Sequence, residues 1–354
     1  MIVYWLMFSS VLLFALLETA NFSSNHKLEH TRYQLWVVFF IILIVVGFRS
    51  EVGGDWFAYL TYFERVQSIG LLEAFLLKDP GYMLLNYFVY NIGGNIYLVN
   101  VFSASIFISA LIAFCKKQPR PMLSILMAVP YMVIVVAMGY TRQSLALGFT
   151  MFAMVAFINK SPIKFLLWIF IATTFHKTAA IFLFFTLFLH GLNRILVILL
   201  FVCISLFTYI FFWLDTSTNF YTTYVESGAQ SSGTLVRLWM SFIPALLYLI
   251  FKRYFDVNKT EHRIILIYSI ASILAVMGYL IYPGSTAIDR MAIYILPLQL
   301  LVISRLPNLF KNNSKTLVVL GIIIYYFLVQ FVWLFFSANK AAWLPYKFYP
   351  FTFI

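Results

Sequence analysis

The chain has 354 residues, of which 63% are hydrophobic and only 10% are charged. A soluble domain carries roughly 25% charged residues, so this composition excludes a soluble protein and indicates an integral membrane protein. The net charge of +12 comes largely from short loops between apolar runs, where membrane orientation explains it and no nucleic-acid partner is expected.

The apolar runs predict an all-α, polytopic helix bundle of about twelve membrane-spanning helices, each near the roughly 20 residues that a bilayer requires. No separate soluble domain is expected, so residues 1–354 are predicted to form one membrane domain. The predicted spans are 2–18, 35–48, 96–115, 122–138, 142–158, 163–175, 177–190, 195–213, 238–251, 264–282, 291–304 and 316–336. Cys115 and Cys203 lie in or beside these spans, where neither a disulfide nor a metal site is expected.

The loops between the predicted spans fall into two sets that differ in charge. Most Lys and Arg residues lie in short loops of one set, which is therefore predicted to be cytoplasmic, and both termini then lie outside. The outer segment 49–95 contains amphipathic stretches that predict surface helices at Trp56–Ile69, Leu71–Leu77 and Tyr82–Tyr90. The outer segment 215–237 is predicted to be a binding loop or lid, and the tail 342–354 an interfacial anchor.

Six charged or titratable residues lie at the ends of predicted spans, all on the outer face, although charges near the bilayer are costly. They are Arg49, Asp55, Arg142, His176, Asp289 and Arg290. Their shared face favours one polar site that opens to the non-cytoplasmic side.

The turn after the second predicted span carries the strongest pattern. Gly53 and Gly54 allow a tight turn, and Asp55 follows at an N-cap position for the next helix. A capping Asp and a snorkelling Arg49 would explain this turn structurally. A functional site explains Arg49 better, because positive charge is not favoured on this side. The segment Lys78–Tyr82, in contrast, is expected to be a plain turn.

The other candidates each allow a structural and a functional interpretation. Arg142 opens a span with no acidic residue nearby, so its partner is either a ligand phosphate or, as a structural bridge, Asp55 or Asp289. His176 is either an interfacial hydrogen-bonding residue or a general base. Asp289 is expected to neutralise Arg290 locally.

These residue types indicate the chemistry of a substrate. Arg side chains suit a phosphate or diphosphate, and carboxylates with aromatic and hydroxyl groups suit a sugar whose hydroxyl loses a proton. No glycine-rich phosphate loop, nucleotide fold or metal-ligand spacing occurs, so neither a cofactor nor a metal is expected. A transporter or flippase for a lipid-linked saccharide would also combine Arg and carboxylates, but it more often places charges at the midplane and contains inverted repeats.

Five short motifs, which follow one another along nearly the whole chain, resemble those of EpsG/Wzy-type polymerases of O-antigen or exopolysaccharide. They comprise Arg49, Gly53, Asp55, Trp56 and Tyr59; Asp79, Gly81 and Tyr82; Arg142, Gln143 and Ala146; His176, Thr178 and Ala179; and Arg290 with Tyr294. Each motif is short, and the ordered set carries the specificity. Two positions depart from the pattern, namely Asp79, where Glu is more usual, and Lys177 after His176.

The resemblance implies a bacterial inner-membrane polymerase whose architecture is similar to that of C-type glycosyltransferases. Its substrates would be undecaprenyl-diphosphate-linked oligosaccharide repeats at the periplasmic face. A growing chain on one lipid would be transferred to a sugar hydroxyl on another, releasing undecaprenyl diphosphate. A chain-length regulator is a candidate protein partner.

We assign a role to each candidate residue as a hypothesis. Asp55 is the first candidate for the base and His176 the second. Arg142 and Arg290 would hold the leaving diphosphate, and Arg49 would hold the acceptor's diphosphate or orient Asp55. Further substrate contacts are expected from Tyr59, Gln143, Tyr221, Tyr224 and Tyr294. A membrane acyltransferase and a single-sugar transferase with a lipid-phosphate donor stand as rival enzyme classes.

Overall fold

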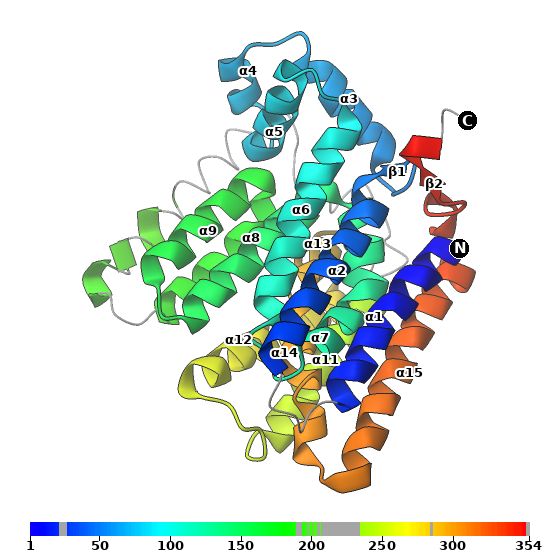
Figure 1. Ribbon diagram of the computed structural model, residues 1–354. Coiled ribbons are helices and arrows are strands. Elements are labelled where there is room, and N and C mark those ends of the chain that lie inside the picture. The colour runs from blue at the N-terminus through cyan, green and yellow to red at the C-terminus, as the bar shows by residue number, and fades with distance from the viewer. Residues whose placement is uncertain are drawn as a thin grey trace.

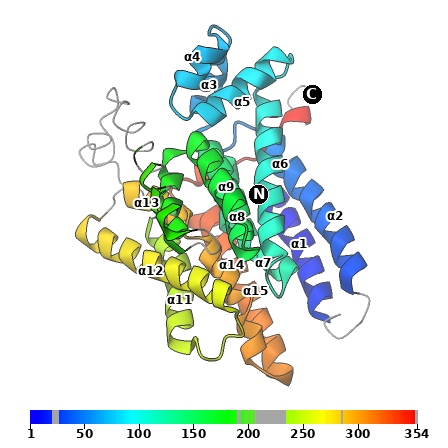
Figure 2. The same ribbon diagram turned by 90° about the vertical axis from the view of Figure 1, so that its left-hand side faces the viewer.

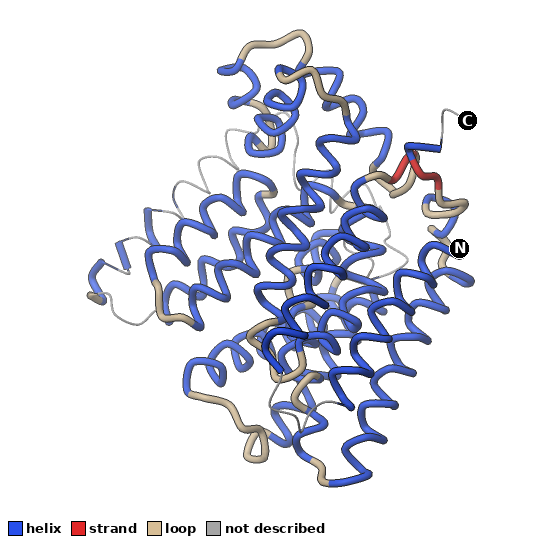
Figure 3. Tube along the Cα trace, viewed as in Figure 1, coloured by secondary structure: helices blue, strands red, loops and turns tan. Residues whose placement is uncertain are grey.

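The computed structural model describes residues 1–20, 27–188, 193–196, 198–199, 201–203, 206, 234–283 and 286–351. These residues are predominantly helical, and helices occupy most of the trace in Figure 3. A two-stranded antiparallel sheet pairs β1 (Arg49–Ser50) with β2 (Lys347–Phe348), and β2 lies close to the C-terminus.

The helices are joined by short connections. The N-terminal part of the chain forms α1 (Ile2–Ala20), α2 (Lys27–Gly47), α3 (Trp56–Val66), α4 (Leu71–Leu76), α5 (Pro80–Asn91), α6 (Ile96–Cys115), α7 (Pro121–Ala128), the π-helix η1 (Val129–Ala137), α8 (Thr141–Ile158), α9 (Pro162–Phe175) and the 3₁₀-helix η2 (Lys177–Phe188). The C-terminal part forms α11 (Thr234–Phe251), α12 (Lys259–Ile281), α13 (Thr286–Ile293), α14 (Pro297–Ile303), α15 (Asn312–Phe336) and short 3₁₀ turns at Leu306–Leu309, Lys340–Ala342 and Tyr349–Phe351.

Among the described residues, seven helices are long and apolar enough to cross a bilayer. They are Ile2–Thr19, Ile96–Cys115, Thr141–Ile158, Thr234–Phe251, Lys259–Ile281, Ile288–Leu309 and Asn313–Phe336. Shorter apolar helices coincide with further predicted spans at Tyr33–Gly47, Pro121–Ala137, Pro162–Phe175 and Lys177–Phe188. The protein is thus built as an all-α polytopic membrane protein, although helix length alone does not establish twelve spans.

The bundle has a buried centre and a lipid-facing periphery. The continuous helix α7–η1, together with α8 and α14, is buried along nearly its whole length. The outer helices α1, α12 and α15 expose many Leu, Ile and Phe side chains instead. Apolar side chains of this kind are stable when they face hydrocarbon. A helix can cross it because the backbone groups are hydrogen-bonded within the helix.

The three predicted surface helices are present as α3, α4 and α5. They lie together at one end of the bundle, and the connections from α11 to α12 and from α14 to α15 lie at the other end (Figure 1). The apolar face of α3 packs inward through Trp56, Tyr59, Phe63 and Val66. Arg142 and His176, which follow these helices in sequence, lie next to Asp79 at the start of α5.

Two predicted boundaries differ from the structure. The predicted span 291–304 is interrupted, because α13 ends at Ile293 and α14 begins at Pro297, a residue without an amide proton to continue the helical ladder. The helix α11 begins at Thr234, inside the segment 215–237 that was expected to be a loop. The predicted span 195–213 and most of the segment 215–237 lie outside the described residues.

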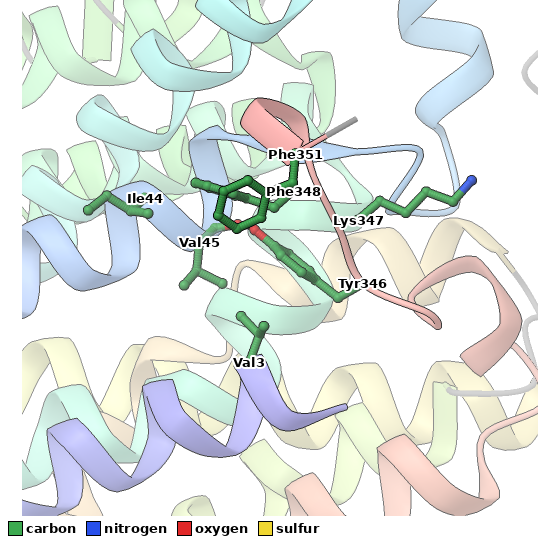
Figure 4. A pocket seen from close by; sticks show the side chains of 7 residues that line it. All are labelled: Val3, Ile44, Val45, Tyr346, Lys347, Phe348 and Phe351. Atoms are coloured by element: carbon green, nitrogen blue, oxygen red, sulfur yellow. The ribbon is translucent and has the colours of Figure 1, made fainter. Parts of the chain in front are cut away.

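The C-terminal tail, which was expected to be an interfacial anchor, also packs against the bundle. Its strand β2 pairs with β1, and Trp343 is 1% exposed and donates from Nε1 to the carbonyl of Ile134 in η1 at 2.7 Å. Tyr346 donates from its hydroxyl to the carbonyl of Val45 at 2.8 Å. Figure 4 shows the tail laid against α1 and α2 over a cavity of about 520 Å³, lined by Val3, Ile44, Val45, Tyr346, Lys347, Phe348 and Phe351.

Candidate functional site

Arg49 fastens the turn after α2 to two helices of the bundle. It is 1% exposed, and its guanidinium donates to the carbonyls of Val46 at 2.6 Å and Val52 at 3.2 Å. It also donates to Asn100 Oδ1 of α6 at 3.1 Å and to Thr141 Oγ1 of α8 at 2.8 Å. Four hydrogen bonds to the protein make Arg49 a positioning residue for the turn that carries Asp55.

Gly53 allows this turn to rest directly on the break before α8. Its φ of +116° disfavours any side chain, and a Cβ there would lie 2.2 Å from the carbonyl oxygen of Met138. Its amide donates to the carbonyl of Ala342 at 2.7 Å, and the amide of Asp55 donates to the carbonyl of Gly139 at 3.3 Å. Three distant parts of the chain are thereby joined beside the site.

Asp55 occupies the N-cap position of α3, as predicted, but its side chain does not cap the helix. The described residues give its carboxylate one hydrogen bond, from Tyr59 Oη to Oδ2 at 3.5 Å, and the residue is partly exposed. A partly exposed carboxylate held by one long hydrogen bond retains the capacity to accept a proton from a ligand.

Asp79 is the site residue that the sequence analysis underestimated. The segment Lys78–Tyr82 was expected to be a plain turn. The partner expected for Arg142 was either a ligand phosphate or, as a structural bridge, Asp55 or Asp289. Instead, Asp79 is 4% exposed and its Oδ2 lies 2.7 Å from Nη1 of Arg142. Asp79 has a left-handed backbone conformation, with φ of 55°, at the N-cap of α5.

The charge of Asp79 depends on its neighbours. Burial raises the pKa of this carboxyl, but the neighbouring His176 and Arg142 outweigh burial and hold the pKa below its ordinary value. The Nδ1 atom of His176 lies 3.8 Å from Oδ2, too far for a hydrogen bond. Asp79 is therefore ionised at neutral pH and balances the charge of Arg142.

Gly81 brings Asp79 to this position. A Cβ at Gly81 would lie 2.5 Å from Oγ1 of Thr174 and 3.0 Å from the ring of Phe175. The first turn of α5 therefore packs against the last turn of α9 at a distance that only glycine permits. His176 follows directly at the C-cap of α9, next to Asp79.

Arg142 has donor capacity that the described residues do not use. Its Nη1 pairs with Asp79, but its buried Nε has no hydrogen-bond partner. Its guanidinium carbon lies 4.7 Å from the ring centroid of Tyr62 and 5.9 Å from that of Tyr59. Tyr82 packs against both rings. A cation beside a tyrosine wall fits a ligand with an anionic group and a sugar ring.

Gln143 joins α8 to α13. It donates from Nε2 to the backbone carbonyl of Arg290 at 2.6 Å and accepts from Arg290 Nη1 at 3.2 Å through Oε1. The guanidinium carbon of Arg290 also lies 4.4 Å from the ring centroid of Tyr140. Arg142 and Gln143 are consecutive residues of α8. The contact between Gln143 and Arg290 therefore places Arg142 and Arg290 on adjacent helices.

His176 lies between α9 and η2 and is 8% exposed. Neither of its ring nitrogens has a hydrogen-bond partner among the described residues. Two residues later, Thr178 donates to Oη of Tyr294 at 3.3 Å, which ties η2 to the end of α13. A buried imidazole without a hydrogen-bond partner among the described residues is available to a ligand hydroxyl.

Asp289 does not serve as the local partner that was expected for Arg290. It pairs with Arg237 at the start of α11, with Nη2 and Oδ1 2.8 Å apart, and both residues are buried. This connection was not foreseen, because Arg237 and Asp289 lie in separate predicted segments. It anchors α13 to α11 beside the site.

The structure brings most of the predicted site residues together at the end of the bundle covered by α3–α5. We refer to Asp55, Asp79, Arg142, His176 and Arg290 as the polar cluster. Gln143, Tyr59 and Tyr294 contact members of this cluster or their helices. Arg49 donates to Thr141, the residue before Arg142. Tyr221 and Tyr224 lie outside the described residues. Among the described residues, no three His, Cys, Asp or Glu side chains are placed to hold a metal ion.

Comparison with known proteins gives one match. No curated protein and no solved structure matches the chain. A family model described as the EpsG family matches residues 32–348, which include every member of the polar cluster. The match confirms the family suggested by the ordered motifs, and the chain belongs to the EpsG family.

Proposed function

We propose that this protein is a polysaccharide polymerase of the bacterial inner membrane. It joins undecaprenyl-diphosphate-linked oligosaccharide repeats at the periplasmic face and releases undecaprenyl diphosphate. Membership of the EpsG family supports a membrane enzyme of polysaccharide synthesis. A bundle of twelve spans, similar to C-type glycosyltransferases, and a chain-length regulator as partner belong to the same proposal.

One observation carries the proposal most directly. Asp55, His176 and Arg142 lie in one cluster, and each has polar atoms without a strong partner in the described protein. The cluster contains two further charged groups, Asp79 and Arg290, at the end of the bundle that α3–α5 cover. This combination provides a proton acceptor and two cations in one small space.

In the proposed reaction, the hydroxyl of the acceptor sugar attacks the anomeric carbon of the lipid-linked donor chain. The hydroxyl proton passes to the carboxylate of Asp55, with His176 as the second candidate base. The bond between the anomeric carbon and the diphosphate oxygen breaks, and the electron pair leaves with the diphosphate. Arg142 and Arg290 stabilise the negative charge that develops there, and Tyr59 packs against the sugar.

Arg49 has a supporting role in this mechanism. Of the two roles considered for it, orienting Asp55 agrees better with its four hydrogen bonds to the protein than does holding a second diphosphate. Gln143 keeps Arg290 in place, and Tyr294 keeps α13 beside His176.

The test is polymerisation by the purified protein in liposomes that contain a lipid-linked repeat, with the products separated by gel. Wild-type protein is expected to give a ladder, and Asp55→Asn to slow it about 10²–10⁴-fold, the usual contribution of a general base. The control Glu64→Gln removes an exposed carboxylate from the same helix and should leave the ladder unchanged.

Each alternative gives a different result. Transport of the repeat across the bilayer without any ladder would establish a flippase and reject polymerisation. A full ladder from folded Asp55→Asn would remove Asp55 as the base and leave His176→Ala as the next variant to measure.

A further inference from the structure

An apolar groove is lined by residues of η2, α12 and α13. The helix α13 contacts both η2 and α12, and Figure 2 shows α12 close to α13. Phe182 and Phe185 of η2 pack against Tyr268 of α12. It forms a cavity of about 530 Å³. Its walls include Phe182 and Phe185 of η2, Ala271 and Ala275 of α12, and Ile288 of α13. The polar cluster does not use this groove, and no motif accounts for it.

The groove follows α12 along the surface of the bundle. Its α12 wall extends from Ile267 to Gly278, which spans about 16 Å along a helix axis. Its rim residues Phe184, Ile270 and Leu274 are about half exposed or more, so the groove opens to the outside of the bundle. A long apolar chain fits such a channel, whereas a polar ligand would have no hydrogen-bond partners along it.

One end of the groove meets the polar cluster. On α13, Ile288 and Met291 line the groove, and Arg290 between them reaches Gln143. Tyr294 also lines the groove, and its hydroxyl accepts a hydrogen bond from Thr178, near His176. Tyr294, which follows α13, therefore belongs both to the wall of the groove and to the contacts beside His176, so the groove adjoins the polar cluster at this residue.

We propose that this groove binds the isoprenoid chain of the lipid diphosphate, with the diphosphate held at Arg290 and Arg142. The inference rests on the proposed function, because that function supplies an anionic lipid. The site and the lipid match in charge and polarity. Arg290 and Arg142 match the anionic diphosphate, and the apolar walls of the groove match the isoprenoid chain. An occupant with a long tail and a doubly charged head satisfies both ends at once.

Binding can be measured without turnover. The probe is farnesyl diphosphate that carries a diazirine at the far end of its chain, added to the full-length protein in detergent and activated by light. Labelled peptides are expected from η2 and α12. In the variant Ala275→Phe, a ring fills the groove, and labelling should fall about tenfold, the loss expected from excluding roughly two methylene groups.

The matched control is Met277→Phe, which places the same ring on an exposed face of α12 outside the groove. It should label like wild type. Phosphatidylglycerol at the same concentration should compete poorly, because a diacyl lipid lacks the diphosphate. Equal competition by phosphatidylglycerol, or full labelling of Ala275→Phe, would overturn the proposal and identify the groove as an ordinary lipid-facing surface.

Failure of the groove and failure of the proposed function give distinct results. With a long-chain lipid-linked repeat, Ala275→Phe should raise the KM for polymerisation about tenfold without lowering kcat, since the ring lies away from the reacting atoms. If wild type labels in the groove but makes no polymer, the groove stands and the polymerase function fails. If wild type makes polymer and Ala275→Phe has an unchanged KM, the function stands and the groove fails.

Discussion

The ion pair of Asp79 and Arg142 is the central contact at the residue scale. Asp79 is almost fully buried, so its removal leaves the Arg142 charge without its 2.7 Å partner in a largely desolvated place. We expect Asp79→Asn to lower the free energy of unfolding by about 3 kcal/mol, the cost typical of breaking a buried ion pair. Thermal unfolding in detergent measures this loss.

A double variant separates stability from activity. Asp79→Asn with Arg142→Gln removes both charges, so it should regain most of the lost stability. Polymerisation should be absent, because Arg142 no longer stabilises the leaving diphosphate. Recovery of both properties would show that the pair is structural and that Arg142 does not act on the substrate.

The pH dependence of this effect follows from the lowered pKa of Asp79. A carboxyl whose pKa is lower in the folded state stabilises the protein at pH values above its unfolded pKa of about 3.9, and this stabilisation is lost as the pH falls through the folded pKa. The advantage of wild type over Asp79→Asn should therefore be constant between about pH 5 and 8 and decline below about pH 4. A loss near neutral pH would show that the carboxyl is not ionised in the folded protein.

The sequence located Arg142 but could not identify its partner. An Arg that opens an apolar span without a neighbouring acid must find a counter-charge elsewhere, and Arg142 finds it in Asp79. The partner is 63 positions away, and only the fold brings it near. The one available signal was the motif of Asp79, Gly81 and Tyr82, whose glycine is now explained by the contact with α9.

At the scale of elements, the packing of α5 on α9 sets the geometry of the polar cluster. Gly81→Ala would force a methyl group against Thr174 and Phe175 and move α5 away, taking Asp79 from Arg142 and His176. We expect polymerisation to fall at least tenfold, with a stability loss of about 1–3 kcal/mol. Both the ladder assay and thermal unfolding report on this change.

The control for this packing is Gly70→Ala at the start of α4, where a Cβ meets no atom within 4 Å. It should behave like wild type. Partial rescue of Gly81→Ala by Thr174→Ala, which removes the closest contact, would support the steric cause. If Gly81→Ala is fully active, α5 is free to shift and does not fix the cluster.

The elements themselves were predicted unevenly, for physical reasons. The amphipathic stretches gave α3, α4 and α5 closely, because burial of one helix face leaves a periodic pattern. The break at Pro297 was not recognised, although a proline inside an apolar run is a signal for the end of a helix. The π-helix η1 was not recognised, because an apolar run gives no signal of a changed hydrogen-bond ladder. Trp343 was misjudged as interfacial for a similar reason, since its contact with Ile134 joins parts of the chain far apart in sequence.

At the scale of the whole molecule, charge is distributed between two ends. The polar cluster lies at the end covered by α3–α5, and the basic segment between α11 and α12, with Lys252 and Arg253, lies at the other end (Figure 1). The positive-inside rule then predicts that the cluster faces the periplasm. We propose this orientation, and labelling tests it.

Two variants with one introduced cysteine each decide the orientation, in a Cys203→Ser background that removes the exposed native thiol and leaves only the buried Cys115. Lys78→Cys, next to the polar cluster, should react with a membrane-impermeant maleimide in intact spheroplasts, whereas Lys252→Cys should react only after permeabilisation. Both positions are exposed, so a lack of labelling reflects the membrane rather than burial. The reversed pattern would place the cluster in the cytoplasm and exclude polymerisation at the periplasmic face. Labelling on opposite sides also requires an odd number of crossings between residues 78 and 252, as the predicted twelve-span arrangement has. Labelling of both positions from one side would therefore reject that arrangement, whatever the function of the site.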